Sequence, residues 1–256
     1  MHDFQFQPLP NLPGWASAHV PTIGSTNSTM AALYEKKASA LDRHWLTAAE
    51  QTEGRGRRNR PWASPPGNFY GSVCLGIEGV RAPNIAILPL AIGIAIQKTV
   101  AQLASGTASL KWPNDVLLDN AKCCGLLMER HTGSQGVSDV IIAGIGLNIT
   151  SHPPDTPYPA THLAAHGFSG SVETVFNTLA MSLDAVLRDL RSPGFVPQVR
   201  QTWLASAKGV GDVVDVRLAN NTLRGIFEQL DDEGRLVLRL ADKTKRIIAA
   251  GDVFFA

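Results

Sequence analysis

The sequence predicts an α+β protein in which a mixed, mainly antiparallel sheet with flanking helices is followed by a small β-barrel. Two long segments, 84–104 and 171–190, are rich in apolar residues and indicate helices. Short apolar segments between them are bounded by turn residues, which is typical of antiparallel strands. After Lys208 only short alternating segments remain. We therefore expect a first domain over 1–207 and a second over 208–256.

The first domain is expected to begin irregularly, because residues 1–20 are rich in proline. Ser25–Leu41 starts with capping residues and continues with helix formers, so it predicts a helix. His44–Glu50 and Asn68–Ile77 have the composition of strands. Between these strands, Gln51–Gly67 lacks apolar periodicity. A loop of this length inside a compact domain is usually functional or disordered.

The remaining elements follow from short-range patterns. After the helix expected over 84–104, four apolar segments predict an antiparallel meander, at 108–112, 115–118, 123–130 and 138–149. Residues 171–190 have the three-and-four apolar spacing of an amphipathic helix that ends before Pro193 and Gly194. In the second domain, alternating segments predict the strands of the barrel, at 213–218, 223–230, 235–240 and 246–255.

The composition narrows the class of protein. Lys plus Arg total 23 and Asp plus Glu total 22, so the formal net charge is +1, and 44 % of the residues are hydrophobic. The longest apolar run, Ile85–Ile96, is too short to span a bilayer, and the N-terminus lacks the layout of a signal peptide. Cys74, Cys123 and Cys124 form neither a disulfide framework nor a zinc cluster. We expect a cytoplasmic protein with reduced thiols and no membrane association.

One local feature departs from this neutral background, because Arg55, Arg57, Arg58 and Arg60 fall within six residues. Three interpretations compete: a solvated run of charge, a nucleic-acid patch or nuclear signal, and an anion clamp that closes over a small ligand. A nucleic-acid surface spreads its charge over a face and interleaves aromatic residues. Here the charge lies in one loop between two apolar strands. Arginine forks bind carboxylates and phosphates, and glycine lets the backbone approach closely, so we favour the clamp.

Two lysines lie beside predicted turns. In "KWPND", Lys111 ends a strand, and a hairpin turn explains the motif when it is taken alone. Asp115 is a candidate magnesium ligand, because Mg²⁺ favours one or two carboxylates together with phosphate oxygens. Lys122 opens a strand that contains Gly125, and a glycine inside a strand often marks the close approach of a ligand or of another backbone.

Two further motifs have simple explanations. The segment "GSTNS", 24–28, is a helix cap, although its hydroxyl groups can also bind a ligand. The segment "AGIGLN", 143–148, lacks the third glycine and the following helix of a dinucleotide fingerprint, so we reject a dinucleotide site there.

The motifs are far more specific in combination. "STN", "EQTEGRGRR.R.W.SP.GN.Y", "KWPND", "K..G.L.E" and "AGIGLN" occur in this order, and together they resemble the biotin protein ligases. "YPATHL", 158–163, is similar to a further segment of that family near the nucleotide. The resemblance covers the chain from about Ser25 to its end. It implies a catalytic domain like that of class II aminoacyl-tRNA synthetases, followed by an SH3-like barrel.

The resemblance also implies a reaction and its residues. Biotin and ATP would form biotinyl-5'-AMP, from which biotin passes to a lysine of the biotin carboxyl carrier protein of acetyl-CoA carboxylase. The expected biotin-binding residues are Ser25, Thr26, Asn27, Gln51, Gly54, Arg55, Gly56, Arg57 and Lys122. The expected ATP-binding residues are Arg57, Arg58, Arg60, Lys111, Asn114 and Asn148. Lys111, Lys122 and Arg57 are the expected catalytic residues, and Asp115 is the expected ligand of Mg²⁺.

The chain departs from the family pattern at two places. Asn59 stands where the pattern has the last glycine of the arginine loop, and asparagine tolerates left-handed backbone well, so we expect the loop to survive. Only about two dozen residues precede "STN", too few for the DNA-binding domain of the family's repressors, so we expect no specific DNA binding. A lipoate-type protein ligase and a nucleic-acid-binding module remain the alternative functions.

The loop Gln51–Gly67 contains few apolar residues that would anchor it. We therefore expect its closed form to be stabilised by the anionic adenylate, which it would shield from water.

Overall fold

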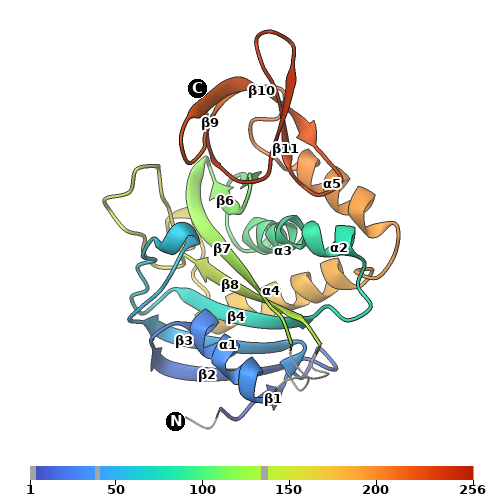
Figure 1. The fold of residues 1–256 in the computed structure, drawn as a ribbon. Helices are drawn as coiled ribbons and strands as arrows, with labels where there is room; N and C mark the ends of the chain where they lie inside the picture. Colours follow the sequence, from blue (N-terminus) through green and yellow to red (C-terminus); the bar gives the residue numbers. More distant parts are fainter. Residues whose placement is uncertain (1–3, 38–40, 134–137, 256) are drawn as a thin grey trace.

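The computed structural model describes residues 4–37, 41–133 and 138–255 (Figure 1). Within these residues an eight-stranded sheet has the order β1-β2-β3-β4-β8-β7-β6-β5. Its strands are β1 (Gln7–Pro8), β2 (Ala16–Ile23), β3 (His44–Gln51), β4 (Phe69–Gly76), β5 (Ala108–Lys111), β6 (Asp115–Leu118), β7 (Ala121–His131) and β8 (Val140–Leu147). Strand β2 runs parallel to β3, and the other neighbouring pairs are antiparallel. The expected mixed, mainly antiparallel sheet and its meander β5–β8 are therefore confirmed.

The prediction of an irregular segment over 1–20 was wrong, because it contains β1 and most of β2. Strand β2 reads "ASAHVPTI", in which small and polar residues hide the usual alternation. Ala16 and Ala18 are buried, and the strand is held by parallel pairing with β3, as in the pair Ala18 and Leu46. A parallel partner that lies far along the chain leaves no local signal in the sequence.

The helices are α1 (Thr26–Lys37), α2 (Ala82–Ala86), α3 (Leu88–Leu103), α4 (Val172–Leu187) and α5 (Phe195–Ala205). The helix expected over 84–104 is divided at Ile87 into α2 and α3, with Pro89 in the first turn of α3. Proline is favoured there because the first turn does not use its missing N–H group. The sequence does not predict helix α5, because Pro193 and Gly194 indicate the end of the preceding helix, whereas Gly194 is the N-cap of α5.

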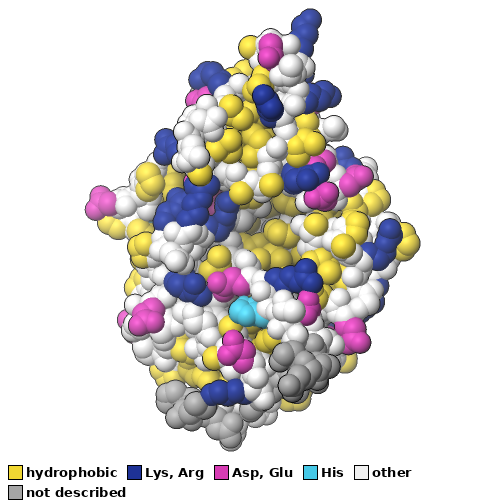
Figure 2. Space-filling model, in the orientation of Figure 1, with side chains coloured by type: hydrophobic (Ala, Val, Ile, Leu, Met, Phe, Trp, Pro, Cys, Tyr) yellow, Lys and Arg dark blue, Asp and Glu magenta, His cyan; other side chains and the backbone are white. Residues whose placement is uncertain are grey.

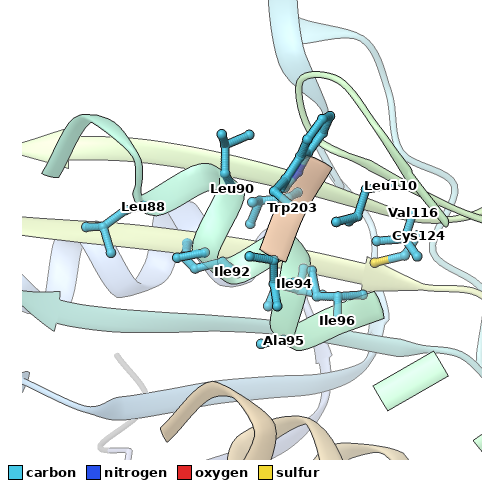
Figure 3. Packing of buried hydrophobic residues seen from close by; sticks show 14 of the residues in the cluster. Leu88, Leu90, Ile92, Ile94, Ala95, Ile96, Leu110, Val116, Cys124 and Trp203 are labelled. Carbon is cyan, nitrogen blue, oxygen red and sulfur yellow. The ribbon is translucent and has the colours of Figure 1, made fainter. Parts of the chain in front are cut away.

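The sheet separates two hydrophobic clusters, because neighbouring residues of a strand face opposite sides. Val73 of β4 belongs to the larger cluster, which α3, α4 and α5 cover. Cys74, the next residue, belongs to the smaller cluster beneath α1, with Met30 and Tyr34. Figure 3 shows the centre of the larger cluster, where side chains of α3 lie between the sheet and Trp203 of α5.

A second sheet forms the C-terminal region and is antiparallel throughout, in the order β12-β11-β10-β9-β13. Its strands are β9 (Val213–Arg217), β10 (Thr222–Leu230), β11 (Leu236–Arg239), β12 (Lys245–Ile248) and β13 (Asp252–Phe255). The single strand expected over 246–255 is thus two strands, separated by a bend at 249–250. The expected domain boundary between Ala207 and Lys208 stays a prediction.

The end of β5 and the "KWPND" motif contact the C-terminal region. The backbone N–H of Lys208 donates to Leu110 O at 2.8 Å. The indole of Trp112 is buried and donates to Gly234 O, in a turn of the C-terminal sheet, at 3.0 Å. The peptide bond between Trp112 and Pro113 is cis. The turn after β5 therefore lies against the C-terminal region, as Figure 1 shows for the neighbouring β6.

None of the helices within 4–37, 41–133 and 138–255 is long and apolar enough to cross a membrane.

The packing of α3 gives a prediction about stability. Ile94 of α3 is 2 % exposed and belongs to the larger hydrophobic cluster, so Ile94→Ala is expected to lower the free energy of unfolding by about 2–5 kcal/mol. The control Met181→Ala removes a side chain of α4 that is 54 % exposed and is expected to change it by less than about 0.5 kcal/mol. Urea denaturation measures both. Equal shifts of the two midpoints would contradict the assigned core.

Candidate active site

A pocket opens between the strands β5–β8, the arginine loop and β13 of the C-terminal sheet. Figure 2 shows a hollow near the middle of this face, with Lys and Arg side chains beside it. Most of the predicted site residues line the pocket, namely Ser25, Thr26, Asn27, Gln51, Arg55, Gly56, Arg57, Arg60, Lys111, Asn114, Asp115 and Lys122. Residues 80 or more positions apart in the sequence therefore converge on one space.

Three predicted residues do not belong to this lining. Gly54 packs against its own loop, since an added Cβ would lie 2.4 Å from Trp62 O. Asn148 is buried and donates to Thr161 O at 3.0 Å, so it holds the segment 158–161, which begins at Tyr158. Arg58 points toward the C-terminal sheet and pairs with Asp252 at 3.2 Å.

One end of the pocket is a network of uncharged polar groups. The backbone N–H and the hydroxyl of Thr26 both donate to Gln51 Oε1, at 2.9 and 3.1 Å. Ser72 Oγ lies 2.7 Å from Thr26 Oγ1 and donates to Asn27 Oδ1 at 2.6 Å. Gln51 Nε2 donates to Ser64 Oγ at 3.0 Å. Because these side chains hold one another, their orientations are set before any ligand binds.

A carboxylate that the sequence did not single out organises the same end. Asn27 Nδ2 donates to Glu129 Oε2 at 2.9 Å, and Arg55 pairs with Glu129 Oε1 at 3.4 Å. Arg55 also donates to Ser28 Oγ at 3.0 Å. Glu129 is the last residue of the "K..G.L.E" pattern, so its place in the motif was visible although its partners were not. Ser72 gave no signal, because it lies inside an apolar strand.

The floor of the pocket is made of paired glycines. Gly125 and Gly146 lie opposite each other on β7 and β8. An added Cβ at Gly146 would lie 2.4 Å from Trp62 Nε1, and one at Gly125 would lie 2.9 Å from the Trp62 ring. The close protein neighbour of Gly125 is thus an indole of the arginine loop, and Gly125 itself lines the pocket, so the close approach of a ligand there stays a prediction. Trp62 anchors the loop to the sheet, so the loop has more apolar support than the sequence indicated.

The other end of the pocket is cationic, and Lys122 is its most enclosed member. Lys122 Nζ lies 2.6 Å from Asp115 Oδ1, and their side chains are only 13 % and 15 % exposed. Burial acts to lower the pKa of Lys122, but the attraction of Asp115 outweighs it and keeps the pKa above its usual value. The ammonium group also lies over the rings of Trp62 and Tyr158, at 5.4 and 5.1 Å. Lys122 is therefore held as a fixed cation.

Lys111 lies among aromatic rings. Its Nζ is 5.8 Å from the Tyr158 centroid, 5.5 Å from that of Phe254 and 5.8 Å from that of Phe255. Burial lowers the pKa of Lys111, and Asp115 partly opposes this effect. The two phenylalanines belong to β13, so the C-terminal sheet contributes directly to the cationic end.

The arginine loop has the backbone that its sequence suggested. Residues Arg57–Asn59 form a 3-10 turn, and both Arg58 and Asn59 have a φ of 56°. Asn59 thus adopts the left-handed conformation that the family pattern provides with glycine, as we expected. The loop reverses here, and Arg55 pairs with Pro61 across the turn in a short β-bridge.

The arginines of this turn share one acidic partner. Asp252, at the start of β13, lies 3.7 Å from Arg57, 3.2 Å from Arg58 and 3.0 Å from Arg60. Arg57 also donates to Asn114 Oδ1 at 2.9 Å. Burial lowers the pKa of Arg57, while Asp252 opposes this effect. In this structure the loop is closed over the pocket by contacts with the protein itself, a contribution that the sequence did not reveal.

The cysteines have no place in the site. Cys74, Cys123 and Cys124 are free and buried, and burial raises the pKa of Cys74 and of Cys123 to about 12. Such thiols are protonated and unreactive at neutral pH. The described residues contain no group of three or more His, Cys, Asp or Glu side chains that would hold a metal ion.

Comparison with known proteins gives a consistent result. Residues 22–148 match the Biotin/lipoate A/B protein ligase family, and residues 211–256 match the Biotin protein ligase C terminal domain. The chain is 34 % identical to the biotin–[acetyl-CoA-carboxylase] ligase of Paracoccus denitrificans, over 91 % of this chain and 99 % of the relative. It is 30 % identical to the bifunctional ligase/repressor BirA of Bacillus subtilis, and there it spans 64 % of the relative.

The solved structures agree in fold. The biotin protein ligase of Aquifex aeolicus in complex with biotin and ATP matches 93 % of this chain and 97 % of its own, with a TM-score of 0.78 and 24 % identity. The ligase of Leishmania major in complex with biotinyl-5-AMP has a TM-score of 0.65, with 93 % and 100 % covered and 23 % identity. The expected fold, like that of the class II aminoacyl-tRNA synthetases and followed by a β domain, is confirmed. The chain belongs to the biotin protein ligase family.

Proposed function

We propose that this protein is an ATP-dependent ligase that converts biotin and ATP to biotinyl-5'-AMP and pyrophosphate. It then transfers the biotinyl group to a lysine of the biotin carboxyl carrier protein of acetyl-CoA carboxylase. The observation that carries the proposal is the division of the pocket into an end built from hydrogen-bonding side chains, where the charge of Arg55 is paired with Glu129, and an end lined by Lys111, Lys122 and Arg57. Biotin has the matching layout, with a polar ureido ring at one end and a carboxylate at the other.

The first step joins two anions, and the protein must offset their repulsion and align them. The biotin carboxylate oxygen attacks the α-phosphorus, the bond to the β-phosphate oxygen breaks, and pyrophosphate leaves. Lys122, which lies inside the pocket, is proposed to contact the carboxylate and the α-phosphate. Lys111, with the amide of Asn114, is proposed to bind the nucleotide phosphates, and Arg57 is proposed to stabilise the charge that develops at the α-phosphate.

In the second step the acceptor lysine attacks the acyl carbon as a neutral amine, and AMP leaves with the phosphate oxygen. The amine loses one proton in forming the amide. The protein needs no nucleophile of its own for either step. Its remaining task is to keep water from the mixed anhydride, and the closed arginine loop with the Trp62 indole on the glycine floor is suited to that task.

Magnesium is proposed to enter with the nucleotide. The carboxylate of Asp115 and the amide of Asn114 both line the pocket. These two oxygen donors fit Mg²⁺, which takes most of its ligands from phosphates and water. Asp115 would hold the ion, and the ion would neutralise phosphate charge. Because Asp115 also pairs with Lys122 at 2.6 Å, the ammonium group and the ion would share this carboxylate.

We further propose that the protein is cytoplasmic and binds no specific DNA sequence. In the described part of the chain, the arginines at 57, 58 and 60 pair with an internal carboxylate, and the net charge is only +1. Fluorescence anisotropy with duplex DNA at physiological salt tests this, and tight sequence-selective binding would refute it.

The function is tested by pyrophosphate exchange into ATP. We expect exchange that depends on biotin and is absent with lipoate, followed by transfer of biotin to a carrier domain as measured by intact mass. Exchange that prefers lipoate would favour the alternative ligase. No exchange with either acid, together with binding of single-stranded nucleic acid, would favour the nucleic-acid-binding alternative.

The role of Lys122 is tested in a single turnover. Lys122→Ala removes the fixed cation and is expected to slow pyrophosphate release about 100-fold, which corresponds to about 2.7 kcal/mol. The control Lys245→Ala removes a surface lysine of β12 that pairs with Glu228 and is expected to leave the rate unchanged. If Lys122→Ala releases pyrophosphate as fast as the control, Lys122 does not act in adenylation.

A further inference from the structure

The C-terminal sheet supplies the arginine loop with its counter-ion. In the described part of the chain, the ion pairs of Arg57, Arg58 and Arg60 all go to Asp252, at 3.7, 3.2 and 3.0 Å. The Asp252 side chain is 22 % exposed, so water screens these pairs only in part. Two of the pairs are also hydrogen bonds, from Arg58 and Arg60 to Asp252 Oδ2. One carboxylate therefore holds three like charges together.

The position of Asp252 is fixed by the sheet. Asp252 lies opposite Arg217 in the pairing of β13 with β9. The preceding Gly251 lets the strands approach, because an added Cβ would lie 2.9 Å from a methyl group of Val216. Gly251 O lies 3.5 Å from both terminal nitrogens of Arg57. The strand thus presents a carboxylate and a carbonyl oxygen to the loop from a rigid support.

The two ends of the arginine loop have separate anchors. Arg55, at the biotin end, pairs with Glu129 of β7 and with Ser28. The arginines at 57, 58 and 60 pair with Asp252 of β13. A change at Asp252 is therefore expected to affect the nucleotide end of the pocket and to leave the biotin end in place.

We propose that Asp252 is a positioning residue, which holds the arginine turn of the loop against the C-terminal sheet and so keeps the pocket closed over the adenylate. The proposal rests on the proposed ligase function. If Asp252 is neutralised, three neighbouring arginines lose their shared counter-ion, repel one another and lose their tether to β13. A loop that is organised beforehand loses less entropy when it closes on a ligand, so this loss weakens retention of the intermediate.

The test compares three variants. Asp252→Asn keeps the shape and removes the charge, while Asp252→Glu keeps the charge on a longer side chain. The matched control is Asp215→Asn on β9, which removes an ion pair with Arg224 at 3.3 Å that does not involve the loop. Hydrogen exchange of residues 55–61 in the protein alone reports on the tether. Calorimetry gives biotin affinity, and stopped-flow fluorescence gives the dissociation rate of biotinyl-5'-AMP.

We expect Asp252→Asn to speed hydrogen exchange in residues 55–61 and to raise the dissociation rate of biotinyl-5'-AMP at least about tenfold, which corresponds to about 1.4 kcal/mol. Biotin affinity is expected to stay within about twofold of the wild-type value, because Arg55 keeps its own partner. Asp252→Glu is expected to restore slow dissociation in part. The control Asp215→Asn is expected to match the wild type in all three measurements.

Three results would overturn the proposal. The first is that Asp252→Asn leaves both the dissociation rate of biotinyl-5'-AMP and the hydrogen exchange of residues 55–61 unchanged. The second is that Asp215→Asn changes them as much as Asp252→Asn does, and the third is that Asp252→Asn weakens biotin binding by the same factor as it weakens retention of biotinyl-5'-AMP. Each of them leaves the ligase function standing if the wild-type protein forms biotinyl-5'-AMP. Failure of the wild-type protein to form it would instead refute the proposed function, and the hydrogen exchange would still show whether Asp252 holds the loop.

Discussion

The ion pair between Lys122 and Asp115 is the interaction on which the cationic end of the pocket depends. An isolated ammonium group in so enclosed a position would lose its proton, and with it the charge that an anionic substrate requires. Asp115 prevents this, because its attraction outweighs the effect of burial on the Lys122 pKa. The pair is placed by antiparallel pairing of β6 with β7, in which Asp115 lies opposite Gly125, three residues beyond Lys122. The register of β6 and β7 therefore brings Asp115 beside Lys122, which the proposed chemistry requires.

The same arrangement recurs around the pocket, where three groups of cations each pair with a different carboxylate. Glu129 pairs with Arg55, Asp115 pairs with Lys122, and Asp252 pairs with the arginines of the turn at 57–60. Such pairs position charges more than they stabilise the fold, since much of their Coulomb energy offsets the cost of removing both groups from water. Their arrangement leaves the cations charged, oriented and close together, which is the condition for bringing two anionic reactants into contact.

The sequence predicted those parts of the site whose signal is local. The Arg-Gly loop, "KWPND" and the lysine at 122 each stand out within a few residues, and the left-handed backbone at Asn59 followed from its place at a glycine of the family pattern together with its residue type. The partners could not be predicted in the same way. Asp252 and Arg60 are 192 residues apart, and Ser72 lies unmarked within an apolar strand. Nothing in the one-dimensional pattern indicates that such residues meet, because only the order of the strands and their register bring them together.

The fold shows the same limit. The meander β5–β8 was predicted because turn residues separate its strands, whereas β2 was missed because its small and polar residues hide the alternation and its parallel partner β3 follows only after helix α1. The proposed mechanism requires that one pocket bring the biotin carboxylate and the α-phosphate to Lys122. A crystal structure with biotin and a non-hydrolysable ATP analogue tests it most directly. We expect both anions within hydrogen-bonding distance of Lys122 Nζ, beneath the arginine turn. An ammonium group that contacts neither anion would contradict the proposed mechanism.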